Sequence, residues 1–239
     1  MRELPVSAWA RIAGLVGVIA IGAFSWQHSA WSAEPAVEIP APTQDEPATG
    51  AHSETAVFAG GCFWGVQGVF EHVRGVQQAL SGYSGGSAAT AQYETVSTGK
   101  TGHAESVRVT FDPAQVSYGH LLQVFFSVVQ NPTELNYQGP DEGTQYRSAL
   151  FPLDAAQRTV AQAYIAQLNR ARVFPAPIVT DIENFKGFYP AEGYHQNFLT
   201  LHPDVPYIYF NDLPKIAALK RLFPSLYRSD PVLAQVASR

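Results

Sequence analysis

The stretch that decides the fold is Thr55–Gly65, TAVFAGGCFWG, which reads as a strand that runs directly into a helix. Residues 55–59 are mostly apolar, as in a strand that enters a core. The apolar residues that follow recur at helical spacing: Val66, Val69, Phe70 and Val73. Cys62, the one cysteine among 239 residues, therefore lies at the turn where the helix begins.

The position of Cys62 favours a reactive sulfur. The free N–H groups and the positive dipole at a helix N-terminus stabilise a thiolate, which is the nucleophilic form of cysteine. Flanking glycines leave the sulfur open to a substrate, and Phe63 and Trp64 place an apolar wall beside it. The alternative is a buried structural cysteine, since free cysteine is among the most buried residue types. The glycines and the two aromatic residues favour the reactive interpretation.

The N-terminus has the layout of a secretory signal peptide. Two arginines precede an uncharged apolar run, residues 12–24, and a small-residue segment ends at Ala33. The run is shorter than the roughly 20 residues that a spanning helix needs, so cleavage before Ala33 is predicted. We therefore expect an exported protein, periplasmic or secreted; the alternative is a protein anchored by an uncleaved N-terminal segment.

Composition divides the chain into four regions. Residues 1–33 are the expected signal peptide, and residues 34–54 are an Ala/Pro-rich segment expected to be a solvated, mobile linker. Residues 55–210 are long enough for one domain with a sizeable core. Residues 211–239 form a tail with a helical pattern over 213–222, expected to pack at the domain edge or to be partly mobile.

Strand and helix patterns alternate within the domain. Beyond the first strand and helix, strands are predicted over 106–111, 148–151 and 178–180. Helices are predicted over 118–129 and from Asp154, as N-cap, to about 170. These patterns predict a single α/β or α+β domain with a central mixed sheet flanked by helices.

Four further segments are rich in glycine and polar residues: 82–86, 102–105, 139–148 and 191–196. Together with Gly60–Gly65 they resemble, in order and content, the A-type peptide methionine sulfoxide reductases, which reduce methionine-S-sulfoxide. The resemblance covers about residues 55–205. Its most specific motifs are Gly-Cys-Phe-Trp-Gly and Asp-x-Gly-Thr-Gln-Tyr-Arg-Ser.

The resemblance implies thiol-dependent reduction of free and protein-bound methionine-S-sulfoxide, and so repair of oxidised proteins. Cys62 is the expected nucleophile, which passes through a sulfenic acid. Glu105 is the expected proton donor, with a pKa raised by apolar enclosure. Tyr83 and Tyr146 are expected to donate hydrogen bonds to the sulfoxide oxygen, and Asp141 to order a water or the polar network.

The remaining expectations concern substrate and partners. Phe63 and Trp64 are expected to enclose the S-methyl group, and His195 to lie near the site. Many relatives resolve the oxidised nucleophile with a second cysteine near the C-terminus, but this chain has none after Cys62. We therefore expect an external thiol reductant, such as a thioredoxin-like or glutaredoxin-like protein. We expect a monomer with no cofactor and no metal, and the net charge of −5 argues against nucleic acid as a partner.

Each of these residues also has an ordinary structural interpretation. Glu105 could start a solvent-facing strand, the tyrosines could belong to a turn or the core, and Asp141 could cap a turn. Two rival functions stay open. One is an acyl hydrolase or transferase that uses Cys62, His195 and Glu105; the other is a non-catalytic binder of oxidised methionine.

Overall fold

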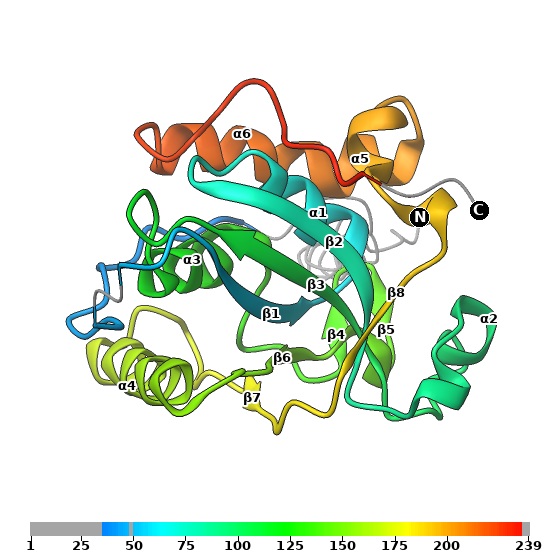
Figure 1. The fold of residues 1–239 in the computed structure, drawn as a ribbon, viewed down its shortest axis with the longest axis horizontal. Coiled ribbons are helices and arrows are strands. Elements are labelled where there is room, and N and C mark those ends of the chain that lie inside the picture. Colours follow the sequence, from blue (N-terminus) through cyan, green and yellow to red (C-terminus); the bar gives the residue numbers. More distant parts are fainter. Residues whose placement is uncertain (1–34, 48–49, 236–239) are drawn as a thin grey trace, which may run out of the picture. The chain divides into compact units, whose positions relative to one another are not determined.

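The computed structural model of the chain describes residues 35–47 and 50–235 (Figure 1). The signal peptide expected over residues 1–33 lies outside the described residues, as do the last four residues. Within the described ranges, no helix is long and apolar enough to cross a membrane.

A six-stranded sheet lies at the centre, with the strand order β7-β6-β1-β3-β2-β8. The strands are β1 Glu54–Gly60, β2 Val76–Ser84, β3 Ala104–Phe111, β6 Ser148–Leu150, β7 Asp181–Ile182 and β8 Phe188–Pro190. β6 and β7 pair in parallel and the other neighbours pair antiparallel, so the sheet is mixed, as the sequence predicts. A separate ribbon joins β4, Tyr137–Gln138, to β5, Asp141–Glu142.

The α-helices are α1 Phe63–Glu71, α2 Tyr93–Val96, α3 Tyr118–Val124, α4 Ala155–Ala171, α5 Phe198–Leu201 and α6 Leu213–Leu222. The π-helical segment η2, Phe125–Val129, continues α3, and the π-helical segment η5, Ile208–Asp212, precedes α6. The short 3₁₀ turns are η1 Ala88–Thr90, η3 Thr144–Tyr146 and η4 Gly193–His195. The helices predicted over 118–129 and 154–170 are confirmed. Asp154 is the N-cap of α4, where its side chain accepts the N–H of Gln157 at 2.9 Å.

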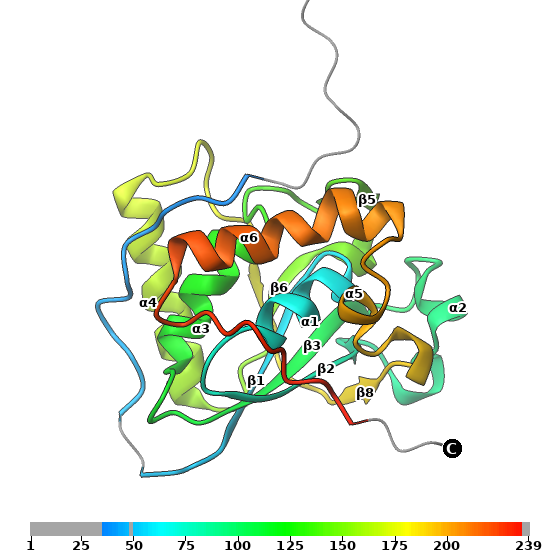
Figure 2. The same ribbon diagram turned by 90° about the horizontal axis from the view of Figure 1, so that it is seen from above.

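The pleat of β1 separates a large core from a small one. Ala56 and Phe58 belong to the large cluster of buried residues, whereas Val57 and Ala59 belong to the small cluster on the other side. The four longest helices, α1, α3, α4 and α6, all contribute to the large cluster (Figures 1 and 2): Val69, Leu121, Tyr164 and Leu219 are examples. The helices therefore share one apolar core against the sheet.

Residues 35–47 differ from the solvated linker that composition predicts. Ile39 is only 5% exposed, and the carbonyl of Pro40 accepts the Tyr164 hydroxyl at 2.7 Å. The Asp45 carboxylate accepts the N–H of Gly119 at 2.9 Å, in the first turn of α3. Composition predicted a linker because the segment has no periodic apolar residues. The segment is held instead through its backbone carbonyls and one capping carboxylate, which need no such pattern.

The tail packs on the domain, one of the two expectations for it, and the boundary expected at residue 210 is not a structural break. It falls inside η5, and both Asp212 and Leu219 are fully buried. The helix predicted over 213–222 is confirmed as α6, which lies along α1 (Figure 2). The described tail therefore continues the domain.

The strand predicted over 178–180 forms slightly later, as β7 at Asp181–Ile182. The N–H of Val179 donates instead to the carbonyl of Pro132 at 2.8 Å, in a loop contact outside the sheet. Apolar β-branched residues mark a strand in sequence, but the pairing partner decides where the ladder begins.

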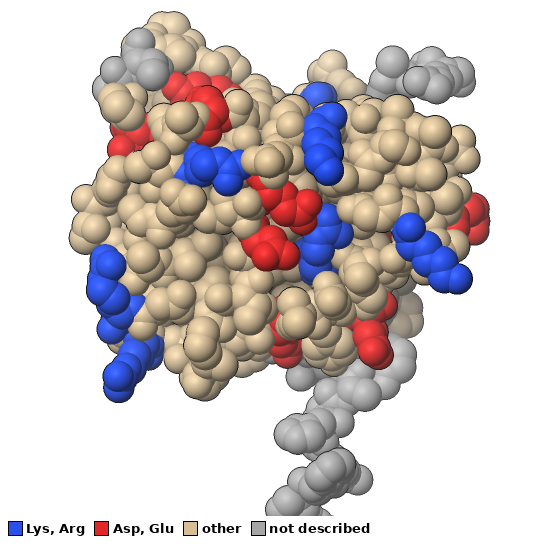
Figure 3. All heavy atoms as spheres, turned by 90° about the horizontal axis from the view of Figure 1, so that it is seen from below, with Lys and Arg blue, Asp and Glu red and all other residues tan. Residues whose placement is uncertain are grey.

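Charges of both signs lie side by side on one face of the molecule (Figure 3). Only 15% of the residues are charged. On the face drawn in Figure 3, the Lys and Arg side chains lie among the Asp and Glu side chains, with uncharged surface between them. That face therefore presents no broad field of one sign to a charged macromolecule.

Candidate active site

Cys62 is the N-cap residue of α1, two residues after β1 ends. The turn depends on Gly61, which has φ +88° and whose missing Cβ would lie 2.7 Å from Cβ of Gln138. Gly60 is similarly close to the Phe125 ring. The chain can therefore pass between β4 and η2 only with glycine at these positions, and the half-buried sulfur of Cys62 emerges at the helix start.

Glu105 lies beside this helix start. Its side chain, on β3, is 2% exposed, and its carboxylate Oε2 accepts the N–H of Phe63 at 3.0 Å. Burial raises the pKa of Glu105 to about 8, the nearby Asp141 adds to the increase, and the bond from Phe63 opposes it. The carboxyl therefore holds its proton at neutral pH, and the expectation of a raised pKa is confirmed.

The sulfur itself differs from expectation. The helix N-terminus predicts a stabilised thiolate, but burial raises the pKa of the Cys62 thiol, and Glu105, Asp212 and Asp141 raise it further. The N–H of Trp64 acts in the opposite sense and is outweighed. Desolvation and three carboxyl groups thus override the helix dipole, and the resting group is a thiol.

Three phenols, those of Tyr93, Tyr146 and Tyr207, interact electrostatically with Cys62, and Tyr146 is the one that was predicted. The pKa of Tyr146 is raised by burial and then by Glu105, Asp141, Cys62 and Tyr93, so Tyr146 interacts with the groups around the sulfur. The pKa of Tyr93, on α2, is likewise raised by burial and by Glu105 and Cys62. Sequence reasoning missed Tyr93, because it lies outside the glycine-rich segments and nothing in its immediate neighbourhood marks it.

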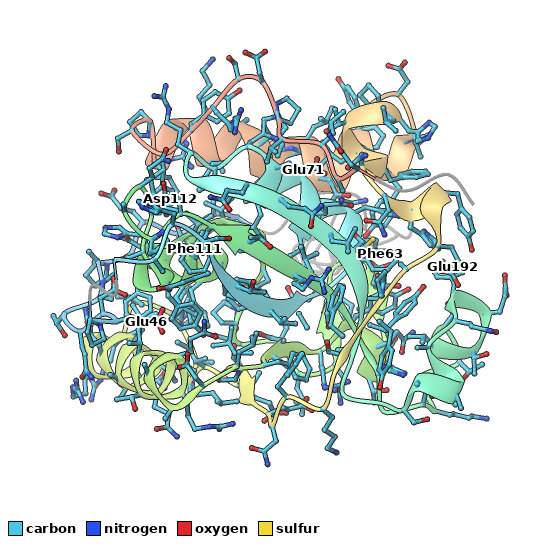
Figure 4. All side chains as sticks on the ribbon, in the orientation of Figure 1. Glu46, Phe63, Glu71, Phe111, Asp112 and Glu192 are labelled. Atoms are coloured by element: carbon cyan, nitrogen blue, oxygen red, sulfur yellow. The ribbon has the colours of Figure 1, made fainter. Side chains whose placement is uncertain are left out.

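Tyr83 has a different place from the one predicted. It is fully buried on β2, directly opposite Glu105 in the β2–β3 register, and its hydroxyl donates to Glu192 Oε2 at 2.8 Å. Phe63 and Glu192 lie on the same side of the molecule in Figure 4. In this structure the Tyr83 hydroxyl therefore donates to Glu192, and Tyr83 lies beside Glu105 in the sheet.

The aromatic wall consists of an exposed part and a buried part. Trp64 keeps some exposed surface; its ring stacks on Phe198 with centroids 4.0 Å apart, and its Nε1–H donates to Nδ1 of His195 at 3.2 Å. Phe63 is only 1% exposed and packs against the rings of Tyr83 and His195. Trp64 therefore forms the accessible part of the wall, and Phe63 supports it from the interior.

His195 lies near the site, as predicted, but it is not placed as a base for Cys62. Burial lowers its pKa, so the ring is neutral, and Nδ1 is occupied as the acceptor for Trp64. Its nearest carboxylate is Glu192, with Nε2 to Oε2 at 4.0 Å, and not Glu105. The ring orients Trp64, and the Cys-His-Glu relay of the hydrolase hypothesis is not formed.

Asp141, on β5, accepts the hydroxyl of Tyr207, a residue that sequence reasoning missed. The Tyr207 ring meets the Trp64 ring edge-on, with centroids 5.9 Å apart. Burial raises the pKa of Asp141, against the lowering effects of Tyr207 and Lys215. The C-terminal segment therefore completes the polar network that Asp141 was expected to order.

In the described part of the chain, no group of three or more His, Cys, Asp or Glu side chains could hold a metal ion.

These features define a thiol enzyme in which one sulfur, one protonated carboxyl and three neutral phenols meet near a helix N-terminus. A sequence profile of the peptide methionine sulfoxide reductase family matches residues 54–225, and the chain belongs to this family. The protein is thus an oxidoreductase that reduces methionine sulfoxide, and the resemblance seen in its motifs is confirmed.

Relatives and solved structures agree with this assignment. Peptide methionine sulfoxide reductase MsrA 2 of Mesorhizobium japonicum is 65% identical over 186 residues, which cover 78% of this chain and 95% of that protein. The fold is similar to methionine sulfoxide reductase A of Corynebacterium diphtheriae, with a TM-score of 0.55, 30% identity, and coverage of 72% of this chain and 89% of that one. It is also similar to Mxr1 from Saccharomyces cerevisiae in reduced form, with a TM-score of 0.57, 29% identity, and coverage of 68% and 92%.

Proposed function

We propose that the protein reduces the S epimer of methionine sulfoxide, with Cys62 as the nucleophile and Glu105 as the proton donor. The observation that carries the proposal is the buried Glu105 carboxyl, which is bonded to the N–H of Phe63 next to Cys62. With its pKa raised to about 8, this carboxyl keeps a proton that an ordinary glutamate has lost at neutral pH.

The reaction balances with these two groups. A sulfoxide sulfur becomes electrophilic when its oxygen is protonated or strongly hydrogen-bonded, so Glu105 gives its proton to that oxygen as the Cys62 sulfur attacks. The attack forms a transient bond between the two sulfurs; the oxygen then passes to the Cys62 sulfur as this bond and the substrate S–O bond break. The sulfoxide is thereby reduced by two electrons to a thioether, and Cys62 is oxidised to a sulfenic acid. The proton of the Cys62 thiol replaces the one that Glu105 donated, so the acid is restored within the turnover.

The phenols and the indole fix the orientation of the substrate. Tyr93 and Tyr146 are neutral donors for the sulfoxide oxygen, because their pKa values are raised above the ordinary tyrosine value. Trp64, held by His195 and Phe198, offers an apolar surface to the S-methyl group. With oxygen and methyl held on opposite sides, only one epimer presents its sulfur to Cys62.

Recovery of the enzyme requires a thiol from outside the chain. Cys62 is the only cysteine, so its sulfenic acid cannot form a disulfide within the protein. One external thiol displaces water to form a mixed disulfide, and a second thiol then releases Cys62. A thioredoxin-like or glutaredoxin-like protein supplies both thiols from one molecule.

The test uses the separated S and R epimers of a methionine-sulfoxide peptide. With dithiothreitol we expect turnover of the S epimer only; comparable rates on the R epimer would overturn the proposal. Without a thiol, excess S substrate should yield about one methionine per chain and a dimedone adduct on Cys62.

The same experiment separates the rival functions. A hydrolase of the Cys-His-Glu type would cleave an activated ester and leave the sulfoxide intact. A non-catalytic binder would release no methionine in excess over protein when dithiothreitol is present. Sustained turnover without any thiol would contradict the sulfenic acid intermediate.

We also propose that the protein is exported, on the strength of the signal-peptide layout of residues 1–33. The check is the N-terminal sequence of the protein recovered from its producing cells. A mature chain that begins at or near Ala33 outside the cytoplasm is the expected result. A full-length chain in the membrane fraction would support the anchored alternative instead.

A further inference from the structure

The start of α6 brings an ion pair to the first turn of α1. Nζ of Lys215 lies 3.2 Å from Oδ1 of Asp212, with the two side chains 13% and 0% exposed. Neither residue belongs to the motifs around Cys62, and both follow the boundary that the sequence suggested for the domain. A charged pair this deeply buried carries a desolvation cost, so its location is informative.

The location is fixed by Gly65, in the first turn of α1. A Cβ on Gly65 would lie 2.1 Å from Oδ1 of Asp212 and 2.9 Å from Nζ of Lys215. The pair therefore rests directly on the bare backbone of the turn that Cys62 caps. Within the described residues, Oδ2 of Asp212 has no hydrogen-bond partner, so Lys215 is the only side chain that compensates this carboxylate.

Several elements around Cys62 contribute an ionisable group that interacts with its sulfur. The carboxyl groups are Glu105 on β3, Asp141 on β5 and Asp212 before α6; the phenols are Tyr93 on α2, Tyr146 on η3 and Tyr207 before η5. Burial raises the pKa values of both Asp212 and Asp141, and Lys215, the one cation among the groups that act in this cluster, opposes that increase in both. His195, the remaining titratable neighbour of Trp64, is neutral.

We propose that the Asp212–Lys215 ion pair is a positioning element of the active site that controls how readily the Cys62 thiol ionises. Asp212 opposes ionisation of the sulfur, and Lys215 limits that opposition by compensating Asp212 and Asp141. The two residues act through the charges around Cys62, and neither touches the substrate. The inference rests on Cys62 as the nucleophile of the proposed function and names residues that set its reactivity.

Substitution of the two members of the pair should shift the pKa of Cys62 in opposite directions. This difference in sign is what identifies the proposed role. Asp212→Asn removes a negative charge near the sulfur, so the pKa of Cys62 should fall by about one pH unit. Lys215→Met leaves two carboxylates uncompensated at the alkaline pH where the thiol titrates, so the pKa should rise. The double variant removes a neutral pair, so its profile should lie close to that of the wild-type protein.

The measurement is the rate of alkylation of Cys62 by iodoacetamide as a function of pH, followed by mass spectrometry of the full chain. Because Cys62 is the only cysteine, each added mass reports this sulfur alone. At a fixed pH below the midpoint we expect about tenfold faster alkylation in Asp212→Asn. No sulfoxide is present, so the result is independent of whether the proposed reduction occurs.

Matched controls carry the same charge changes at exposed positions. Lys220→Met alters an exposed lysine on the same helix, one that lies over the Tyr227 ring, and Asp204→Asn alters an exposed aspartate. Neither should move the profile. Unchanged profiles in Asp212→Asn and Lys215→Met, or shifts of the same sign in both, would overturn the proposal. If Lys215→Met fails to fold, an unchanged profile in Asp212→Asn alone overturns it.

Discussion

The two ends of α1 each hold a buried glutamate with a pKa raised to about 8, yet only one end is an active site. At the N-terminal end, Glu105 accepts the N–H of Phe63; at the C-terminal end, Glu71 is the last residue of the helix and accepts the hydroxyl of Thr200 at 3.2 Å. Burial is the largest cause of the raised pKa in both. Figure 4 labels Phe63 and Glu71, which mark the two ends.

Glu105 and Glu71 differ in the groups that surround them. Glu105 has Cys62, Tyr93 and Tyr146 as neighbours, and it lies at the helix end whose N–H groups still need acceptors. Glu71 lies at the end where the dipole is negative, and its Oε1 has no hydrogen-bond partner among the described residues. A protonated buried acid is therefore not a site by itself; it becomes one where a nucleophile and donors meet it.

The largest expected effect is the removal of the sulfur, which should make the N-terminal end as inert as the C-terminal end. Cys62→Ser should abolish methionine formation, because a serine oxygen is a far weaker nucleophile than sulfur and cannot take up the sulfoxide oxygen as a sulfenic acid, and the chain has no other cysteine. Steady-state assays with dithiothreitol measure this, and thermal unfolding shows whether the fold is retained. Residual turnover well above background would mean that another group attacks the sulfoxide.

The second effect contrasts the two acids directly. Glu105→Gln should slow reduction by about 10²-fold, the usual scale for loss of a general acid. The matched Glu71→Gln variant should keep its turnover number, since it has no contact with the cluster. The wild-type rate should also fall as the pH rises through about 8, where Glu105 loses its proton. Equal effects of the two substitutions would contradict the assignment of Glu105 as the donor.

The third effect separates the phenols. Tyr93→Phe and Tyr146→Phe should each lower the rate roughly tenfold, the scale of one hydrogen bond, because the other phenol remains. Tyr83→Phe should change the rate less than either, because its hydroxyl donates to Glu192 and not into the site. The comparison uses the turnover number for the S epimer. A larger loss in Tyr83→Phe than in Tyr93→Phe would restore the interpretation from the sequence.

The local sequence pattern was sufficient to predict the elements that bury one face and expose the other. The switch from strand to helix around Cys62 and the capped helix α4 follow from spacing and an N-cap residue. The long strand β2, VQQALSGYS, escaped prediction because its two glutamines and its glycine break the alternation. It is a strand because β3 and β8 pair with its two edges, and a single sequence does not show that pairing.

The same division applies to the site. Cys62, Glu105, Asp141 and Tyr146 lie in compact motifs, and the structure brings all four together. The residues that were missed reach the cluster through tertiary packing: Tyr93, Tyr207, Asp212 and Lys215. No local sequence pattern shows that a charged residue near the C-terminus will be buried. Asp212 and Lys215 are buried near Cys62 only because α6 packs on α1.

The smallest expected effect concerns stability at the C-terminal end of α1. Between its ordinary pKa of 4.5 and its raised value of about 8, folded Glu71 keeps a proton that the unfolded chain has lost. The unfolded state binds fewer protons in this window, so the free energy of unfolding falls as the pH rises, by about 1 kcal/mol for each pH unit. Glu71→Gln should remove this contribution and flatten the pH dependence of stability.

Urea unfolding of the wild-type and variant proteins, at several pH values across this window, measures the slope. The slope is more informative than stability at one pH, because any packing cost of the new amide is the same throughout. Glu105 adds a slope of the same sign, so a weaker pH dependence should persist in Glu71→Gln and shrink further when Glu105→Gln is combined with it. Glu38→Gln, at an exposed position, is the control and should leave the slope unchanged. An unaltered slope in Glu71→Gln would mean that Glu71 is ionised in the folded protein, and that the two ends of α1 differ in charge as well as in reactivity.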